Sequence, residues 1–178
     1  MTICIIPARS KSKRIKNKNI KLIDNKPLIS YVIKLAIKSK LFSKIIVSTD
    51  SKKIKKISEK YGASVPFIRS KKLSNDYAST KEVVIDCIKR VNSENEKYHF
   101  CIYPTAILLN IRDLKKAFLK IKKKNFDFLV ATTDYEYSPL RAYKISKNEK
   151  ISFVLNKFVK RRSQDIPRLI HDSGSFYI

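Results

Sequence analysis

The chain has 178 residues, 43% of them hydrophobic, and is therefore expected to fold as one domain, residues 1–178, with a sizeable core. It contains no apolar run near the ~20 residues of a membrane span and no secretory signal pattern, so we predict a cytoplasmic protein with no membrane partner. The net charge of +25 comes mainly from Lys, 31 of 40 cationic residues, spread over almost every predicted helix; we interpret it as solvated surface, with nucleic-acid binding as a minor alternative.

Strand and helix patterns alternate along most of the chain. In chain order, the predicted elements are a strand at 3–6, a helix at 27–40, a strand at 44–49, a helix at 52–61, a short edge strand at 64–68, a helix over 83–91, a strand at 98–102, a helix at 111–121, a strand at 126–132 and a final strand at 174–178. This alternation predicts an α/β fold with a mostly parallel sheet and helices on both faces.

Local signals set several of these boundaries. Asp50 and Ser51 are placed to cap the helix at 52–61, and Gly62 is placed to end it. From Asp134 the periodicity weakens and aromatic residues become frequent. Residues 134–165 are therefore predicted to form a small β-arm over the mouth of a site, or a subunit interface.

The cysteines and histidines do not suggest a metal site. Cys4, Cys87 and Cys101 are far apart in apolar settings, so small buried hydrophobes are favoured over a disulfide or metal ligands. His99 and His171 are too few for a histidine-based cluster.

A cationic loop follows the first predicted strand. Its charged residues are Arg9, Lys11, Lys13, Arg14, Lys16, Lys18 and Lys21. A loop at the end of a strand offers both cations and backbone N–H groups to a polyanion, which in open α/β sheets is commonly a nucleotide. Arg9 lies nearest the strand and is the first candidate for a phosphate contact, while Lys18 and Asn19 are expected to fold back towards it. A solvated basic surface is the alternative interpretation.

The order of residues in this loop resembles a known signature. IPARSKSKRIKNKNI is similar to the phosphate-binding motif I-P-A-R-G-G-S-K-R-I-x-x-K-N-I of the cytidylyltransferases that activate nonulosonic acids, namely sialic, pseudaminic and legionaminic acids. The matching residues are Ile6, Pro7, Ala8, Arg9, Ser12, Lys13, Arg14, Ile15, Lys18, Asn19 and Ile20. Ser10 and Lys11 replace two glycines, so the loop is expected to reach an anion with side chains or with a strained backbone.

The resemblance continues, in order, along nearly the whole chain. The further similar segments are 41–54, 61–69, 73–80, 101–109 and 161–178. In CIYPTAILL, Ile107 stands where the family has proline. The last segment, RRSQDIPRLIHDSGSFYI, is more similar to pseudaminic acid cytidylyltransferases than to sialic acid ones.

The resemblance implies a three-layer Rossmann-like nucleotidyltransferase fold and a reaction. CMP would pass from CTP to a nonulosonic acid, pseudaminic acid being favoured, with release of pyrophosphate, for surface glycans or flagellar glycosylation. Arg9 and Lys18 would be catalytic by neutralising phosphate charge. The implied nucleotide-binding residues are Ala8, Arg9, Ser12, Lys13, Lys18, Asn19, Ser79 and Thr80.

The sugar acid is expected to meet a second set of residues. Arg162 is the candidate for its carboxylate, because a guanidinium binds a carboxylate through two hydrogen bonds. The other candidates are Tyr103, Gln164, His171 and Asp172. Judged alone, Gln164 could cap a loop, and Tyr103 and His171 could be ordinary packed residues.

The resemblance also implies Mg²⁺ as cofactor and a homodimer. The family's metal-binding Asp pair lies in a stretch beyond residue 178, so we expect either a fragment or a truncated protein. The alternatives are a CMP-N-acetylneuraminic or legionaminic acid synthetase, a truncated CTP-binding relative without catalysis, and a basic nucleic-acid-binding protein.

Overall fold

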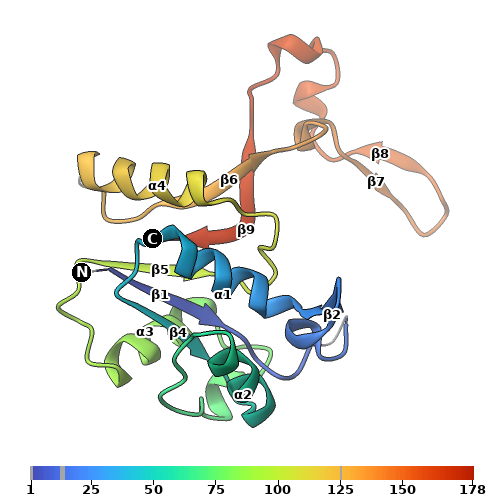
Figure 1. Cartoon of the computed structure of the whole chain (residues 1–178). Coiled ribbons are helices and arrows are strands. Elements are labelled where there is room, and N and C mark those ends of the chain that lie inside the picture. Colours follow the sequence, from blue (N-terminus) through green and yellow to red (C-terminus); the bar gives the residue numbers. More distant parts are fainter. Residues whose placement is uncertain (1, 13–14, 125) are drawn as a thin grey trace. The chain divides into compact units, whose positions relative to one another are not determined.

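Strand β1 lies within the central sheet of the computed structural model (Figure 1). The structure describes residues 2–12, 15–124 and 126–178. The strands of this sheet are β1 (Thr2–Pro7), β4 (Lys44–Ser48), β5 (Tyr98–Ile102), β6 (Val130–Asp134) and β9 (Ile170–Tyr177). Their spatial order is β4-β1-β5-β9-β6, with β1 parallel to both β4 and β5 and with β9 antiparallel to β5. The mostly parallel sheet is therefore confirmed.

Helices cover both faces of the sheet. They are α1 (Leu28–Ser39), α2 (Lys52–Lys60), α3 (Thr80–Arg90) and α4 (Ile111–Lys124). In Figure 1, α1 and α4 lie on one side of the sheet and α3 lies on the other. This arrangement confirms the predicted layers, and the four predicted helices are present with boundaries shifted by a few residues.

Shorter elements join these layers. The remaining strands are β2 (Leu22–Ile23), β3 (Lys26–Pro27), β7 (Tyr143–Ile145) and β8 (Ile151–Phe153). The 3₁₀ turns are η1 (Lys18–Ile20), η2 (Lys72–Ser74), η3 (Pro139–Arg141), η4 (Asn156–Phe158) and η5 (Ser163–Asp165). Two antiparallel hairpins result, β2 with β3 and β7 with β8.

The core is divided by the sheet into two halves. On the α4 side, the fully buried Phe100 of β5 has ring-centroid distances of 5.0 Å to Phe42, 6.0 Å to Phe118 and 6.4 Å to Phe176. On the α3 side, β1 and β4 pack against Cys87 and its neighbours. Since successive residues of a strand point to opposite faces, the continuous apolar run of β1 contributes to both halves.

The three cysteines lie within this core. Cys4, Cys87 and Cys101 are unbonded and buried. Burial raises the pKa of Cys87 and of Cys101 to about 12, and it raises the pKa of Cys4 strongly. They are small buried hydrophobes, as predicted.

Helix α3 begins with a capping box. The Ser79 hydroxyl accepts from the Glu82 N–H at 3.2 Å, and the Glu82 carboxylate accepts from the Ser79 N–H at 2.8 Å. The Ser79 N–H and hydroxyl both donate to the Glu82 carboxylate at 2.8 Å, and these two hydrogen bonds lower the pKa of Glu82 below its ordinary value.

Glu82→Gln is expected to lower the free energy of unfolding at neutral pH and to have a smaller effect in acid. A carboxyl whose pKa is lowered by folding stabilises the fold above its unfolded pKa, and this contribution is lost as the pH falls through the lower folded pKa. Urea unfolding at pH 7 and at pH 3 measures the difference. A Glu82→Gln effect of equal size at both pH values would contradict this explanation.

One predicted strand is wrong, and another is confirmed only in its second half. Residues 64–68 do not form a continuous strand and make two isolated parallel bridges, Ile46 with Ser64 and Thr49 with Ile68. Pro66 lies between them and has no N–H to donate to a ladder. The strand predicted at 126–132 is confirmed in its second half: Leu129 exchanges backbone hydrogen bonds of 3.1 and 2.9 Å with Ile178, and β6 begins at Val130.

Contacts within the chain divide it into two compact units. The first comprises residues 1–130 and 174–178, and the second comprises residues 131–173. Within the second unit, the Tyr143 and Phe153 rings of the β7–β8 hairpin lie 4.5 Å apart, and Arg168 Nε bonds Asp134 Oδ1 at 2.6 Å. Residues 134–165 fall inside this unit, and their role as a dimerisation arm stays a prediction.

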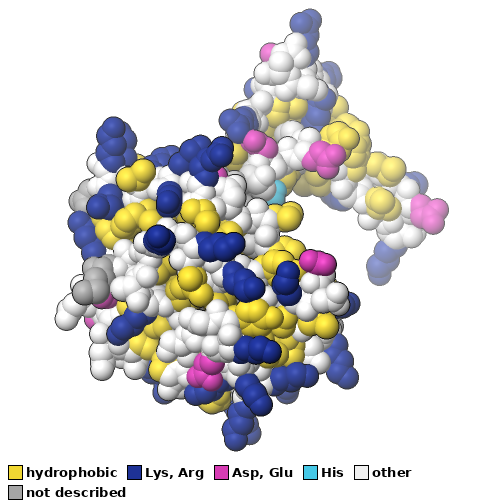
Figure 2. Space-filling model, viewed as in Figure 1, with side chains coloured by type: hydrophobic (Ala, Val, Ile, Leu, Met, Phe, Trp, Pro, Cys, Tyr) yellow, Lys and Arg dark blue, Asp and Glu magenta, His cyan; other side chains and the backbone are white. Residues whose placement is uncertain are grey.

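The cationic side chains are dispersed over the face of the molecule that Figure 2 shows. Figure 2 shows Lys and Arg side chains scattered over the visible face rather than gathered in one stripe, which agrees with a mainly solvated role. Among the described residues, no helix has both the length and the apolar character needed to cross a membrane.

Candidate functional site

A cavity of about 720 Å³ lies at the carboxyl end of β1, within the first unit. Three segments line it: the basic loop after β1, the segment from residue 69 to α3, and the turn after β5. The structure brings six of the predicted site residues to this one cavity: Arg9, Ser12, Lys18, Asn19, Thr80 and Tyr103. The parallel pairing of β1 with β4 and β5 causes this, because parallel strands place their carboxyl ends at one edge.

Arg9 joins the basic loop to the segment that faces it. Its Nη1 donates to the Asn75 carbonyl at 2.7 Å, and its Nη2 lies 3.0 Å from Asp76 Oδ1. The Arg9 side chain is still 36% exposed, so the guanidinium remains accessible to an anion entering the cavity.

Asn19 lies on the same cavity and is only 4% exposed. Its amide Nδ2 donates to the Arg9 carbonyl at 2.9 Å, which fixes the side chain. Its Oδ1 is buried and has no hydrogen-bond partner in the described part of the chain. Since buried acceptors are normally satisfied, a ligand donor that reached Asn19 Oδ1 would complete its hydrogen bonding.

Lys18 reaches the cavity through a local turn. Asn17 has a left-handed backbone with φ 54° and is followed by the single 3₁₀ turn η1, which carries both Lys18 and Asn19. Asparagine adopts this conformation more readily than most residues, so Asn17 suits the position. The chain is thus turned back towards Arg9.

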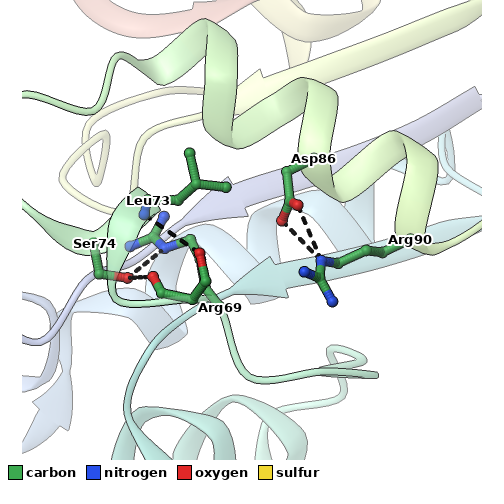
Figure 3. Close-up of polar contacts among 6 residues, drawn as sticks. Arg69, Leu73, Ser74, Asp86 and Arg90 are labelled. Atoms are coloured by element: carbon green, nitrogen blue, oxygen red, sulfur yellow. Dashed lines mark hydrogen bonds and ion pairs between the residues drawn. The ribbon is translucent and has the colours of Figure 1, made fainter.

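Arg69 is a residue that the sequence interpretation did not single out. It lines the cavity and is only 4% exposed, and its Nε donates to Ser74 Oγ at 3.2 Å, as Figure 3 shows. Burial lowers the pKa of Arg69, and the nearby Asp50 carboxylate partly offsets this effect. In the sequence, Arg69 is marked only by its position directly after the predicted edge strand at 64–68.

Asp50 does not cap α2. Ser51 does so alone, its hydroxyl accepting from the Ile54 N–H at 3.3 Å. The Asp50 carboxylate instead accepts two hydrogen bonds from Ser10, one from its N–H and one from its hydroxyl, each at 2.7 Å.

The remaining predicted nucleotide contacts are placed differently. Ala8 is fully buried and donates its N–H to the Ser48 carbonyl at 2.9 Å, so its side chain packs beneath the loop. The Ser79 hydroxyl is engaged in the capping box of α3. Lys13 lies outside the described residues. The roles of all these residues in nucleotide binding stay predictions.

Thr80 and Tyr103 form a wall between two cavities. Thr80 Oγ1 and the Tyr103 hydroxyl lie 2.8 Å apart and share a hydrogen bond. Both residues also line a second cavity, of about 930 Å³ and mainly apolar, together with Phe128 and Tyr177. The Tyr103 ring meets the Tyr177 ring edge-on at 5.8 Å, and the Tyr177 ring stacks on that of Phe128 at 5.9 Å.

Tyr103→Phe is expected to lower the free energy of unfolding by about 1 kcal/mol, because Thr80 loses its partner in a partly buried position. Chemical denaturation at neutral pH measures this change. Tyr143→Phe removes the same atom from a ring that is 60% exposed and serves as the control. Equal effects of the two substitutions would contradict a stabilising Thr80–Tyr103 hydrogen bond.

The predicted sugar-acid residues lie in the second unit, except Tyr103. The His171 and Tyr135 rings are 4.6 Å apart, and His171 Nδ1 lies 2.8 Å from the Asp172 carbonyl. Gln164 is part of η5, and the Arg162 carbonyl accepts from the Asp165 N–H at 3.0 Å. All four side chains are exposed, and their role in binding a substrate stays a prediction.

The described residues offer little to a metal ion by themselves. Among them, no group of three or more His, Cys, Asp or Glu side chains is placed to hold one. Asp76, a carboxylate on the cavity wall, is paired with Arg9. A divalent cation here would need ligands from a bound phosphate, the usual situation for Mg²⁺ with nucleotides.

Comparison with known proteins places this site in a family. The family model described as Cytidylyltransferase matches residues 3–167. A pseudaminic acid cytidylyltransferase of Campylobacter jejuni subsp. jejuni serotype O:2 is 44% identical over 177 residues, which cover 98% of this chain and 76% of that protein. A CMP-N,N'-diacetyllegionaminic acid synthase of Legionella pneumophila subsp. pneumophila is 44% identical over 86 residues, 48% of this chain and 37% of that protein.

A solved structure supports the fold. A CMP:2-keto-3-deoxy-manno-octonic acid synthetase complexed with CTP superposes with a TM-score of 0.73 at 15% sequence identity, covering 99% of this chain and 73% of that one. The Rossmann-like nucleotidyltransferase architecture inferred from the resemblance is therefore confirmed. The family match extends through both units, and the chain belongs to the cytidylyltransferase family.

Proposed function

We propose that this protein transfers CMP from CTP to pseudaminic acid and releases pyrophosphate. The observation that carries the proposal is the cavity in which Arg9, Lys18 and Arg69 converge at the end of β1, in a chain 44% identical to a pseudaminic acid cytidylyltransferase. Three cations around one cavity suit a triphosphate. We place the reaction in the cytoplasm and its product in surface or flagellar glycosylation.

In the proposed reaction, the anomeric hydroxyl oxygen of the sugar acid bonds to the α-phosphorus of CTP. The bond from that phosphorus to the α–β bridging oxygen breaks, pyrophosphate leaves with the electron pair, and the hydroxyl proton is lost to solvent. Such phosphoryl transfer depends mainly on positioning and on neutralising charge. Arg9 and Lys18 supply charge to the phosphates, and the buried Arg69 adds a cation at the base of the cavity.

The nucleoside and the sugar acid need contacts of their own. Asn19 Oδ1 and the Thr80 hydroxyl offer acceptors to the nucleoside. Arg162 is proposed for the sugar-acid carboxylate, with Tyr103, Gln164, His171 and Asp172 for its other polar groups. Mg²⁺, bound to the nucleotide, would neutralise further phosphate charge. A homodimer formed through residues 134–165 is part of the same proposal.

Pyrophosphate release in the presence of CTP, Mg²⁺ and one sugar acid at a time tests the proposal. Pseudaminic, legionaminic and N-acetylneuraminic acids are compared, and mass spectrometry identifies the CMP-sugar. We expect the fastest release with pseudaminic acid. Faster release with either of the others would assign the enzyme to that acid.

Isothermal titration with CTP alone separates binding from turnover. CTP binding without pyrophosphate release from any of the three acids would support a non-catalytic relative. Salt-sensitive binding to DNA or RNA, with no CTP binding, would instead support the nucleic-acid alternative.

A further inference from the structure

The basic loop is anchored by an acidic residue. Both oxygens of Asp50 accept hydrogen bonds from Ser10, at 2.7 Å from its N–H and 2.7 Å from its hydroxyl. Ser10 follows Arg9 directly, and Asp50 follows the carboxyl end of β4. Two bonds to one residue fix both its position and its orientation, because a carboxylate presents its two oxygens in one plane.

A carboxylate at this place acts against the binding of a polyanion, since like charges repel. We therefore expect Asp50 to contribute something to the site that outweighs this repulsion. Asp50 also favours the charged form of Arg69, the buried cation on the cavity wall whose pKa is lowered by burial. One side chain thus orders the loop and offsets the cost of burying a guanidinium charge.

The replacement of glycine at residue 10 fits this arrangement. Neither Ser10 nor Lys11 has a positive φ, so this part of the loop does not need glycine's conformational freedom. The Ser10 hydroxyl is used on Asp50. Serine therefore adds a second attachment point that glycine lacks.

We propose that Asp50 is a positioning residue for nucleotide binding, which holds the start of the basic loop through its two hydrogen bonds with Ser10. This assignment rests on the proposed function, because the ligand whose binding it serves is CTP. Ser10→Ala and Ser10→Gly remove one of the two hydrogen bonds, and Asp50→Ala removes both.

Four substitutions separate the contributions. Ser10→Ala and Ser10→Gly each remove the hydroxyl bond and should weaken CTP binding about 5–10-fold, the effect of one partly buried hydrogen bond. Asp50→Ala removes both bonds and should weaken CTP binding about 25–100-fold. Asp50→Asn can still accept from the Ser10 N–H and can donate to the Ser10 hydroxyl, so it should weaken CTP binding less than Asp50→Ala.

Three measurements on the full chain give the readout. Isothermal titration yields the Kd for CTP, steady-state kinetics yields KM and kcat, and hydrogen exchange follows a peptide over residues 8–20. We expect KM for CTP to rise with the Kd, kcat at saturation to stay within about 2-fold, and the loop to exchange faster in Ser10→Ala and Asp50→Ala. Asp24→Asn, an equal charge change on the exposed β2–β3 turn, is the control.

The outcomes distinguish the two proposals. Suppose that the wild type binds CTP, and that Asp50→Ala and Ser10→Ala leave both the Kd and the loop exchange unchanged. This result would overturn the assignment of Asp50 and leave the proposed function standing. Failure of the wild type to bind CTP would overturn the proposed function, and the role of Asp50 in nucleotide binding with it. In that case loop exchange still decides whether Asp50 orders the loop.

Discussion

Arg9→Ala is expected to lower kcat/KM for CTP by about 100-fold, the lower end of the range for losing one preorganised charged donor, because the Arg9 side chain is 36% exposed and partly screened. Arg9 lines the cavity and is held by Asn75 and Asp76, so its guanidinium is fixed before a nucleotide arrives. The loss should appear in kcat as well as in KM, since phosphate charge changes during the reaction.

Lys11→Ala provides the matched control for Arg9→Ala. Lys11 belongs to the same loop and carries the same charge, but its side chain is exposed and outside the described cavity lining. Its replacement should change kcat/KM by less than about 2-fold, as is usual for a solvated surface charge. Equal losses from both substitutions would mean that the loop acts through its overall charge, and they would remove the argument for a specific Arg9 contact.

Phe100→Ala is expected to lower the free energy of unfolding by about 3–5 kcal/mol, the usual cost of truncating a fully buried aromatic side chain. Phe100 lies on the central strand β5 and contacts the rings of Phe42, Phe118 and Phe176. Because three neighbouring rings come from different elements, the cavity left behind cannot close by the movement of one side chain. Urea denaturation monitored by circular dichroism measures the loss.

Leu119→Ala is the control for Phe100→Ala. Leu119 lies on α4 near Phe118, but its side chain is 66% exposed, so its truncation should cost less than about 0.5 kcal/mol. A Phe100→Ala variant as stable as Leu119→Ala would show that the core on the α4 side does not depend on this aromatic cluster.

Much of the fold can be predicted from the sequence, because the pattern of hydrophobic residues agrees with the positions that are buried in the structure. The predicted strand at 98–102 has the bounds of β5, and the apolar run 3–6 lies within β1. Both strands are central and buried on two faces, so they need continuous apolar runs. The stretch 126–132 is equally apolar, but Phe126 and Phe128 are 48% and 62% exposed. Hydrophobicity alone does not show where strand pairing begins, which here is at Leu129, bonded to Ile178.

Only part of the candidate site can be predicted from the sequence. Arg9, Lys18 and Asn19 follow a strand end, and the order of residues around them carries the family resemblance, which the comparisons confirm. Arg69 and Asp50 follow other segments, and their roles depend on which strand ends meet. A buried cation and an anchoring carboxylate become visible only when β1, β4 and the segment after residue 64 are brought together.

The buried oxygen of Asn19, which has no donor among the described residues, has a thermodynamic consequence. A ligand N–H or O–H that reached it would add a hydrogen bond worth about 1 kcal/mol to binding. A nucleotide with a suitably placed N–H or O–H group therefore gains affinity that an analogue lacking that group cannot gain. The same linkage requires such a nucleotide to raise the melting temperature of the protein, whether or not turnover follows.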